Sequence, residues 1–173
     1  MQLFEQFQYK KDRTQLIEIF MAKNEHQWIA KDGRLKRAFT DFLLYLKLEE
    51  LQTVVYKPVL FIKINAKWAC SVGKIKNEEM ILAFPELCAL LQSPSIYHGM
   101  AIFAHELGHI IYKHAHKNLS LLDAQVEADY FAYLCGYGEE LQEILLDEPQ
   151  SLDLKVRISR LTSHLITQTK KTF

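Results

Sequence analysis

The chain has 173 residues, of which 49% are hydrophobic, 12% aromatic and 24% charged. This composition is typical of one ordinary globular domain, and it excludes disordered, collagen-like and low-complexity chains. The 21 basic and 21 acidic residues give a formal net charge of zero, so the basic surface of a general nucleic-acid binder is not expected. We therefore expect a single domain over residues 1–173 that binds no nucleic acid.

The cysteines and the N-terminus indicate the compartment. Cys70, Cys88 and Cys135 are odd in number, widely spaced and form no C-x-x-C pair, so neither a disulfide framework nor a cysteine zinc cage is expected. The first ten residues lack the basic start and apolar run of a secretory signal, and no stretch is long and apolar enough for a membrane span. We expect a cytoplasmic protein.

Two amphipathic helices are predicted at the N-terminus, within residues 1–52. Apolar residues recur at helical spacing over residues 14–30 and again over residues 35–51. Asp32-Gly33 lies between these two stretches and is expected to join the helices.

The middle of the chain changes to short β-branched and aromatic runs, which predict strands. A small, mostly antiparallel sheet is expected, because Pro58, Gly73 and Asn77 separate the runs. The runs are residues 54–56, 59–64, 68–72 and 80–84.

Four helices are predicted after the sheet, at residues 85–91, 97–116, 120–135 and 151–167. The expected fold class is therefore α+β. A small, mostly antiparallel sheet would pack on the long helix over residues 97–116, with the N- and C-terminal helices on either side. Residues 53–173 would hold the sheet and the helices of a metal site.

The predicted long helix contains the pentapeptide His105-Glu106-Leu107-Gly108-His109, which has the form H-E-x-x-H. Residues four apart on a helix differ by only about 40° of rotation, so both imidazoles leave one face and can bind the same zinc ion. Glu106 beside them is the expected general base. A catalytic zinc needs a third protein ligand and an open position for water, so an acidic residue on a second helix is expected.

The sequence resembles the gluzincin metallopeptidases, in particular the CAAX prenyl protease and HtpX-like group with its soluble relatives, the minigluzincins. Four segments between residues 64 and 161 carry the resemblance: Asn65-Ala66 with Gly73, His105 to His109 with His114, Glu127-Ala128-Asp129, and Arg157-Ile158 with Leu161. The resemblance implies a zincin-like fold, one zinc ion and hydrolysis of peptide bonds.

The sequence leaves the identity of the third zinc ligand open, with Gln125 and Glu127 as the main candidates. In the family it is a Glu four residues before the Asp of the Glu-Ala-Asp segment, and Gln125 occupies that position here. The register favours Gln125, whereas ligand chemistry favours Glu127, because a carboxylate is a commoner zinc ligand than a neutral amide. Asp123 with Glu127 is a third option.

Asp129 and Arg157 are expected to support the ligands. Asp129 would accept a hydrogen bond from a ligand imidazole and fix its tautomer. The resemblance places Arg157 at the site, although a surface Arg on an amphipathic helix is an equal alternative. Ser151 stands where the family usually has a His that stabilises the oxyanion. His114, like its neighbour His116, is expected to be a solvated or capping residue near a helix end.

The expected function is zinc-dependent endopeptidase activity on a peptide or protein substrate, with Glu106 transferring protons. The alternative is a non-catalytic or weakly metal-binding interaction module on the same fold, because Gln125 and Ser151 replace groups the reaction normally uses. A third possibility is a regulatory peptidase that cleaves a repressor, as in the ImmA family, whose zinc motif is similar.

Overall fold

A computed structural model of the chain describes residues 13–56, 59–64, 79–149 and 151–169. The chain divides into two compact units, Met1–Gln92 and Ser93–Phe173. The residues of the predicted metal site all belong to the second unit. The Asn65-Ala66 segment, Gly73 and the predicted strand at residues 68–72 lie outside the described residues.

The first unit begins with short helices rather than two long ones. The predicted helix at residues 14–30 is broken in the structure, and so is the one at residues 35–51. Asp32 accepts hydrogen bonds from the backbone N–H groups of Arg34 and Leu35, and it thereby caps the helix that begins at Gly33. The helical segments are residues 13–22, η1 (Asn24–His26), α2 (Gln27–Ala30), α3 (Gly33–Tyr45) and α4 (Leu48–Tyr56).

The predicted antiparallel sheet is wrong. The described part of the chain is mainly helical and contains one two-stranded sheet, in which β1 (Val59–Lys63) pairs in parallel with β2 (Glu79–Ala83). The register aligns Val59 with Glu79 and Lys63 with Ala83. Both strands belong to the first unit, whereas the helix with the H-E-x-x-H motif belongs to the second and packs on other helices.

Two features explain the error. The β-branched and aromatic side chains of residues 54–56 favour a strand, but these residues end α4, where Leu51, Val54 and Val55 are buried at the i, i+3, i+4 spacing of a helix. Residues 64–78 separate the two strands, whereas hairpin loops have only about 2–5 residues, so the connection is long enough for a parallel crossover.

A buried histidine ties η1 to the first strand. The side chain of His26 is fully buried, its Nδ1 lies 2.7 Å from the carbonyl oxygen of Phe20, and its Nε2 accepts a hydrogen bond from the backbone N–H of Phe61 at 3.1 Å. The imidazole is therefore neutral, with its proton on Nδ1. Burial lowers the pKa of His26 to about 4.

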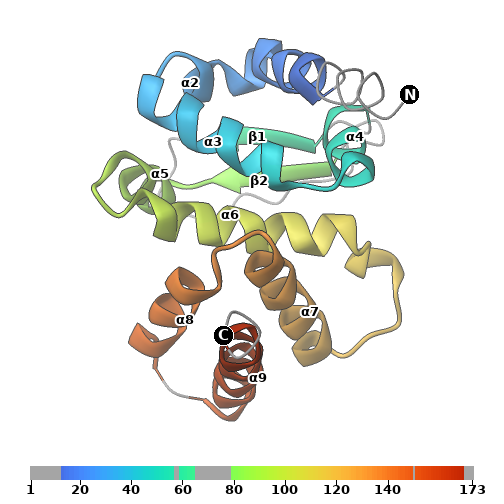
Figure 1. Cartoon of the computed structure of the whole chain (residues 1–173), viewed down its shortest axis with the longest axis vertical. Helices are drawn as coiled ribbons and strands as arrows, with labels where there is room; N and C mark the ends of the chain where they lie inside the picture. The colour runs from blue at the N-terminus through green and yellow to red at the C-terminus, as the bar shows by residue number, and fades with distance from the viewer. Residues whose placement is uncertain (1–12, 57–58, 65–78, 150, 170–173) are drawn as a thin grey trace. The chain divides into compact units, whose positions relative to one another are not determined.

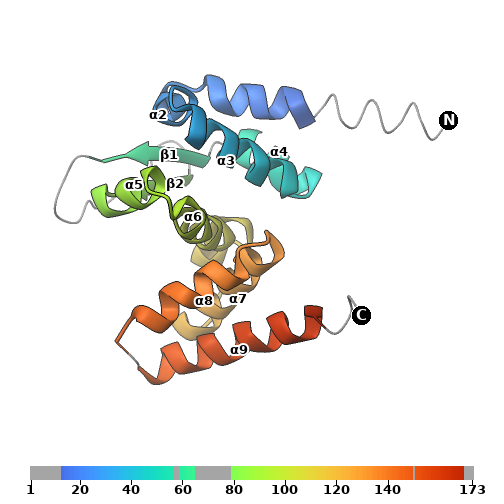
Figure 2. The same ribbon diagram turned by 60° about the vertical axis from the view of Figure 1, so that its left-hand side comes forward.

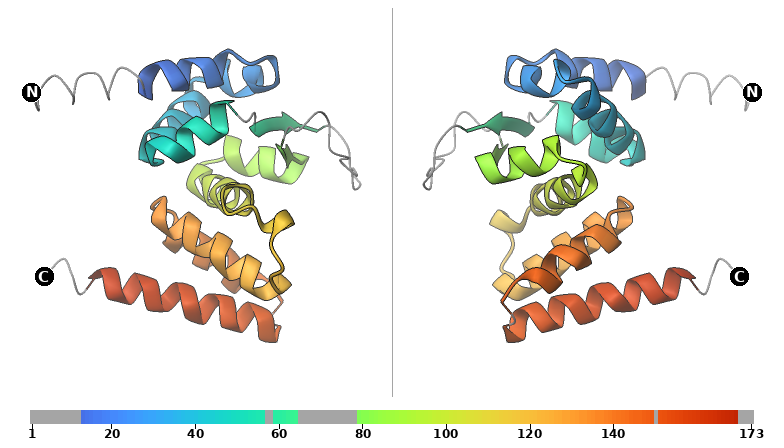
Figure 3. Two further views of the ribbon diagram at one scale, coloured as in Figure 1. Left: turned by 90° about the vertical axis from the view of Figure 1, so that its right-hand side faces the viewer. Right: turned by 90° about the vertical axis from the view of Figure 1, so that its left-hand side faces the viewer.

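The predicted helix at residues 85–91 is confirmed as α5 (Pro85–Gln92), which ends the first unit. The second unit consists of helices in layers (Figures 1 and 2). The long helix α6 packs on α7 and α8, which in turn pack on α9. Figure 3 gives the same order from two further sides, with α7 and α8 between α6 and α9. The elements of this unit are α6 (Ile96–Ile111), η2 (His114–His116), α7 (Leu121–Leu134), α8 (Gly138–Asp147) and α9 (Leu152–Thr169).

The sequence predicts three of these helices in nearly the right places. The long helix ends at Ile111 rather than near residue 116, because Lys113 adopts a left-handed conformation with φ 55°. Ser120 caps α7 by accepting a hydrogen bond from the backbone N–H of Asp123. The helix α8 is not predicted from the sequence.

A glycine lets the helices α6 and α7 approach closely. A Cβ atom built on Gly108 of α6 would lie 2.9 Å from Phe131 Cβ and 3.1 Å from Ala128 Cα, both on α7. Any larger residue at position 108 would force the helices apart. The close approach of a second helix accounts for a glycine inside α6, where it costs helix stability.

Among the residues that the structure describes, no helix has the length and apolarity needed to cross a membrane.

Candidate metal centre

His105 and His109 lie one turn apart on α6 and point their Nε2 atoms at each other. The two Nε2 atoms are 3.2 Å apart, and the rings are nearly perpendicular, with centroids 4.8 Å apart. His105 is buried and His109 is half-buried. The pKa of His109 is lowered to about 4 by burial first, and then by the neighbouring imidazoles of His105 and His114. A neutral imidazole is the form that binds a metal ion.

The separation of the two nitrogens fits a shared zinc ion. Zinc binds imidazole nitrogen at about 2.0–2.1 Å in tetrahedral geometry, which places two nitrogen ligands about 3.3 Å apart. The observed 3.2 Å between His105 Nε2 and His109 Nε2 is close to this value. The donor set therefore fits zinc at these two positions.

Asp129 and Arg157 support His105 from the opposite side. His105 Nδ1 is buried and lies 2.8 Å from Asp129 Oδ1, which is the distance of an ion pair, although the direction of its N–H is not that of a regular hydrogen bond. Arg157 donates from both Nε and Nη2 to the two oxygens of the same carboxylate, each at 2.7 Å. Burial acts to raise the pKa of Asp129, but the hydrogen bonds from Arg157 and His105 outweigh it, so the pKa lies below its ordinary value. The carboxylate is thus charged and holds the proton of His105 on Nδ1, which leaves Nε2 free.

Gln125, rather than Glu127, lies beside the paired nitrogens. The Gln125 side-chain amide nitrogen is 3.4 Å from His109 Nε2. Rotation of the amide would turn its oxygen to the same place. The Glu127 carboxylate instead lies 3.0 Å from His114 Nε2 and 3.1 Å from Lys117 Nζ. The hydrogen bond with His114, followed by that from Lys117, lowers the pKa of Glu127 below its ordinary value.

His114 is not the solvated residue that the sequence predicts. Only 6% of its side chain is exposed. Its Nδ1 lies 2.7 Å from His109 Nδ1, and its Nε2 faces Glu127. Helical spacing could not reveal this contact, because His114 follows the left-handed Lys113 beyond the end of α6. The neighbouring His116 is exposed, as expected.

Three other predicted residues lie at different places. Glu106 is exposed on α6, directly after His105. The Asp123 carboxylate accepts a hydrogen bond from the Ser120 hydroxyl at 2.6 Å, so it belongs to the cap of α7 and not to a ligand pair with Glu127. The Ser151 hydroxyl accepts a hydrogen bond from the backbone N–H of Leu154 at the start of α9.

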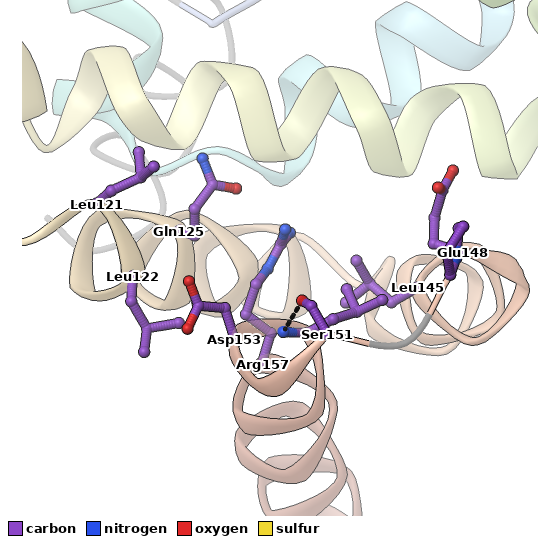
Figure 4. A pocket seen from close by; sticks show the side chains of 10 residues that line it. Leu121, Leu122, Gln125, Leu145, Glu148, Ser151, Asp153 and Arg157 are labelled. Carbon is purple, nitrogen blue, oxygen red and sulfur yellow. Dashed lines mark hydrogen bonds between the residues drawn. The ribbon is translucent and has the colours of Figure 1, made fainter.

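A cavity of about 420 Å³ adjoins the centre (Figure 4). Gln125 and Arg157 line it, and in Figure 4 both side chains point up towards α6. The rest of the wall is partly apolar and partly acidic, and it comes from the start of α7, the end of α8 and the start of α9: Leu121, Leu122, Leu145, Glu148, Pro149, Ser151, Asp153 and Leu154.

Within the described ranges, no three His, Cys, Asp or Glu side chains are grouped to hold a metal ion. The centre therefore offers two imidazoles and one neutral amide, instead of the two imidazoles and one carboxylate that the family resemblance implies. Comparison with known proteins adds no relative: no family model, no curated protein and no solved structure matches the chain.

Proposed function

We propose that the protein is a zinc-dependent endopeptidase that binds one zinc ion through His105 and His109. The observation that carries this proposal is the 3.2 Å separation of the two Nε2 atoms on the H-E-x-x-H helix. The charged Asp129, held by Arg157, supports it, because metal-binding histidines usually donate their other N–H group to a carboxylate. Gln125 is the candidate third ligand.

Zinc, when bound, supplies Lewis acidity and makes water acidic enough to ionise near neutral pH. Glu106 is exposed next to His105, so it can take a proton from the attacking water and return it to the leaving amine. Asp129 and Arg157 keep the His105 ring oriented during these steps. The cavity beside Gln125 has the volume of a small-ligand pocket and offers room for a substrate side chain next to the scissile bond. We place the activity in the cytoplasm.

Cleavage of a mixed peptide library by the zinc-loaded protein tests this function. The wild type should cut peptides, and Glu106→Gln should bind zinc as well as the wild type while its rate falls at least about 100-fold, since general acid–base catalysis contributes at least that much. Retention of zinc with no cleavage of any library peptide by the wild type would exclude the endopeptidase.

A specific observation favours a second candidate, a non-catalytic or weakly metal-binding interaction module. Gln125 supplies a neutral amide where a zinc peptidase uses a carboxylate, and the hydroxyl of Ser151 is occupied as the cap of α9. Gln125→Glu separates the two candidates. A gain of zinc affinity together with new peptidase activity would show that the present centre is impaired. A loss of existing activity would show that Gln125 is suited to catalysis.

A further inference from the structure

His109 and three further side chains form a hydrogen-bonded chain that leads away from His105. His109 Nδ1 lies 2.7 Å from His114 Nδ1. On the other side of its ring, His114 Nε2 lies 3.0 Å from Glu127 Oε2, and Lys117 Nζ lies 3.1 Å from the same carboxylate oxygen. The ring of His114 is nearly perpendicular to that of His109, with centroids 4.9 Å apart.

The hydrogen atoms of this chain have one consistent arrangement when both imidazoles are neutral. Glu127 is a carboxylate and can only accept, so His114 must carry its proton on Nε2. His114 Nδ1 is then an acceptor, and His109 must carry its proton on Nδ1 to donate to it. His109 Nε2 consequently carries no proton, and its lone pair faces His105 Nε2 and the Gln125 side-chain amide.

The backbone provides a second, independent observation. Within a continuous α-helix, a residue five positions after His109 would lie about 140° around the axis from it. Lys113 instead adopts φ 55°, a conformation that residues other than glycine rarely take. This left-handed residue ends α6 and turns the chain so that His114 meets the imidazole of His109.

We propose that His114 and Glu127 are positioning residues for the metal centre: they hold His109 in the tautomer whose Nε2 is free, and Glu127 thus acts on the ion without being its ligand. Lys117 holds the carboxylate in place. The arrangement on the His109 side resembles the one on the His105 side, where the Asp129 carboxylate faces Nδ1 directly and Arg157 holds that carboxylate. This inference rests on the proposed zinc centre.

The first test measures zinc affinity of the full chain by competition with a chelating dye. His114→Phe keeps a ring of similar size but removes both nitrogens, and it should weaken zinc binding roughly 10- to 100-fold, the usual effect of removing an outer partner of a ligand. His114→Asn restores an acceptor for His109 Nδ1 and should recover most of that loss. Glu127→Gln should weaken binding less than His114→Phe does.

His116→Phe is the matched control, because His116 is an exposed histidine in the same short helix η2. Its zinc affinity should equal that of the wild type within error. Equal affinities of His114→Phe and the wild type would overturn the proposal while leaving the zinc centre itself intact.

The second test needs no metal and separates the two proposals. Nitrogen-15 NMR of the histidine rings in the metal-free wild type should show His109 protonated on Nδ1, and in His114→Phe the population should shift towards protonation on Nε2. An unchanged His109 tautomer in that variant would overturn the proposal. If the wild type binds no zinc, the proposed function fails, and this spectrum alone decides whether His114 sets the tautomer.

Discussion

At the level of single residues, the proposed metal centre depends on which nitrogen of each imidazole carries a proton. His105 and His109 each have one nitrogen facing the other and one facing away towards a hydrogen-bond acceptor. The outward partners are Asp129 and His114, which lie on different elements. A change in either partner should therefore affect the ion even though neither partner touches it.

Asp129→Asn tests the buried ion pair. The Asp129 side chain is only 4% exposed and that of Arg157 17%, so the variant leaves the guanidinium with a neutral partner in a mostly buried place. We expect the free energy of unfolding to fall by roughly 3 kcal/mol, the low end for breaking a buried pair. Urea unfolding of Asp129→Asn, Arg157→Met and the double variant measures the coupling. If the losses of the two single variants add up to the loss of the double variant, the interaction between Asp129 and Arg157 contributes nothing to the free energy of unfolding.

The buried imidazole of His26 should make the free energy of unfolding depend on pH. Its pKa is about 4 in the folded chain against 6.5 for the ordinary group, so the native state favours the neutral imidazole. The resulting stability is fully present above pH 6.5 and is lost as the pH falls towards 4. Between about pH 7.5 and pH 5, the wild type should lose about 2 kcal/mol more than His26→Phe does. Equal losses in urea unfolding would contradict a neutral, buried His26.

At the scale of elements, the crossing of α6 and α7 brings the two sides of the centre together. The α6 helix carries His105 and His109, while α7 carries Gln125, Glu127 and Asp129. The contact at Gly108 fixes how closely these helices approach, and hence the distances between the ligands and their partners.

Gly108→Ala tests this crossing. Alanine favours an isolated helix over glycine by about 1 kcal/mol. The added methyl group would nevertheless meet Phe131 and the backbone of Ala128, so we expect a net loss of about 1–3 kcal/mol and weaker zinc binding. Gly33→Ala is the matched control, because nothing lies within 4 Å of the added Cβ there. A Gly108→Ala protein as stable as the wild type, measured by thermal unfolding, would contradict the close crossing.

Much of the helical part of the fold could be predicted from the sequence, and the sheet could not. The helices α5 and α7 lie close to their predicted ranges, and the small and aromatic residues that α7 buries, Ala124, Ala128, Phe131 and Ala132, fall on one face. The strand propensity of residues 54–56 led to a wrong prediction, because Val54 and Val55 belong to α4 and are buried on one face of it. The pairing direction of β1 and β2 depends on the path of the connection, which short β-branched runs do not encode.

Part of the candidate site could be predicted from the sequence: His105 and His109 share one helix, and Asp129 and Arg157, which the sequence also singles out, lie beside His105 on two other helices. The four-residue spacing of His105 and His109 is enough by itself to place both side chains on a common face. The choice between Gln125 and Glu127 depends on how α7 is rotated against α6, which the sequence leaves open. His114 could not be found, because its position follows from one left-handed residue beyond the helix.

In the whole molecule, the candidate site lies within one of the two units. The H-E-x-x-H histidines, their carboxylate partners and the adjoining cavity all belong to Ser93–Phe173. The first unit contains the parallel strands and the buried His26. The proposals for this unit all depend on the binding of one zinc ion at His105 and His109.

The zinc content of the untagged full chain tests for this ion. It is measured by elemental mass spectrometry after equilibration with micromolar zinc and removal of the free ion. The wild type should retain one zinc ion per chain, and His105→Ala should retain none. His98→Ala is the control for adventitious binding, because His98 is a histidine of the same helix that contacts Glu143 away from the centre, and this variant should retain the ion. No zinc in the wild type, or equal zinc in His105→Ala, would rule out a zinc site at these two histidines.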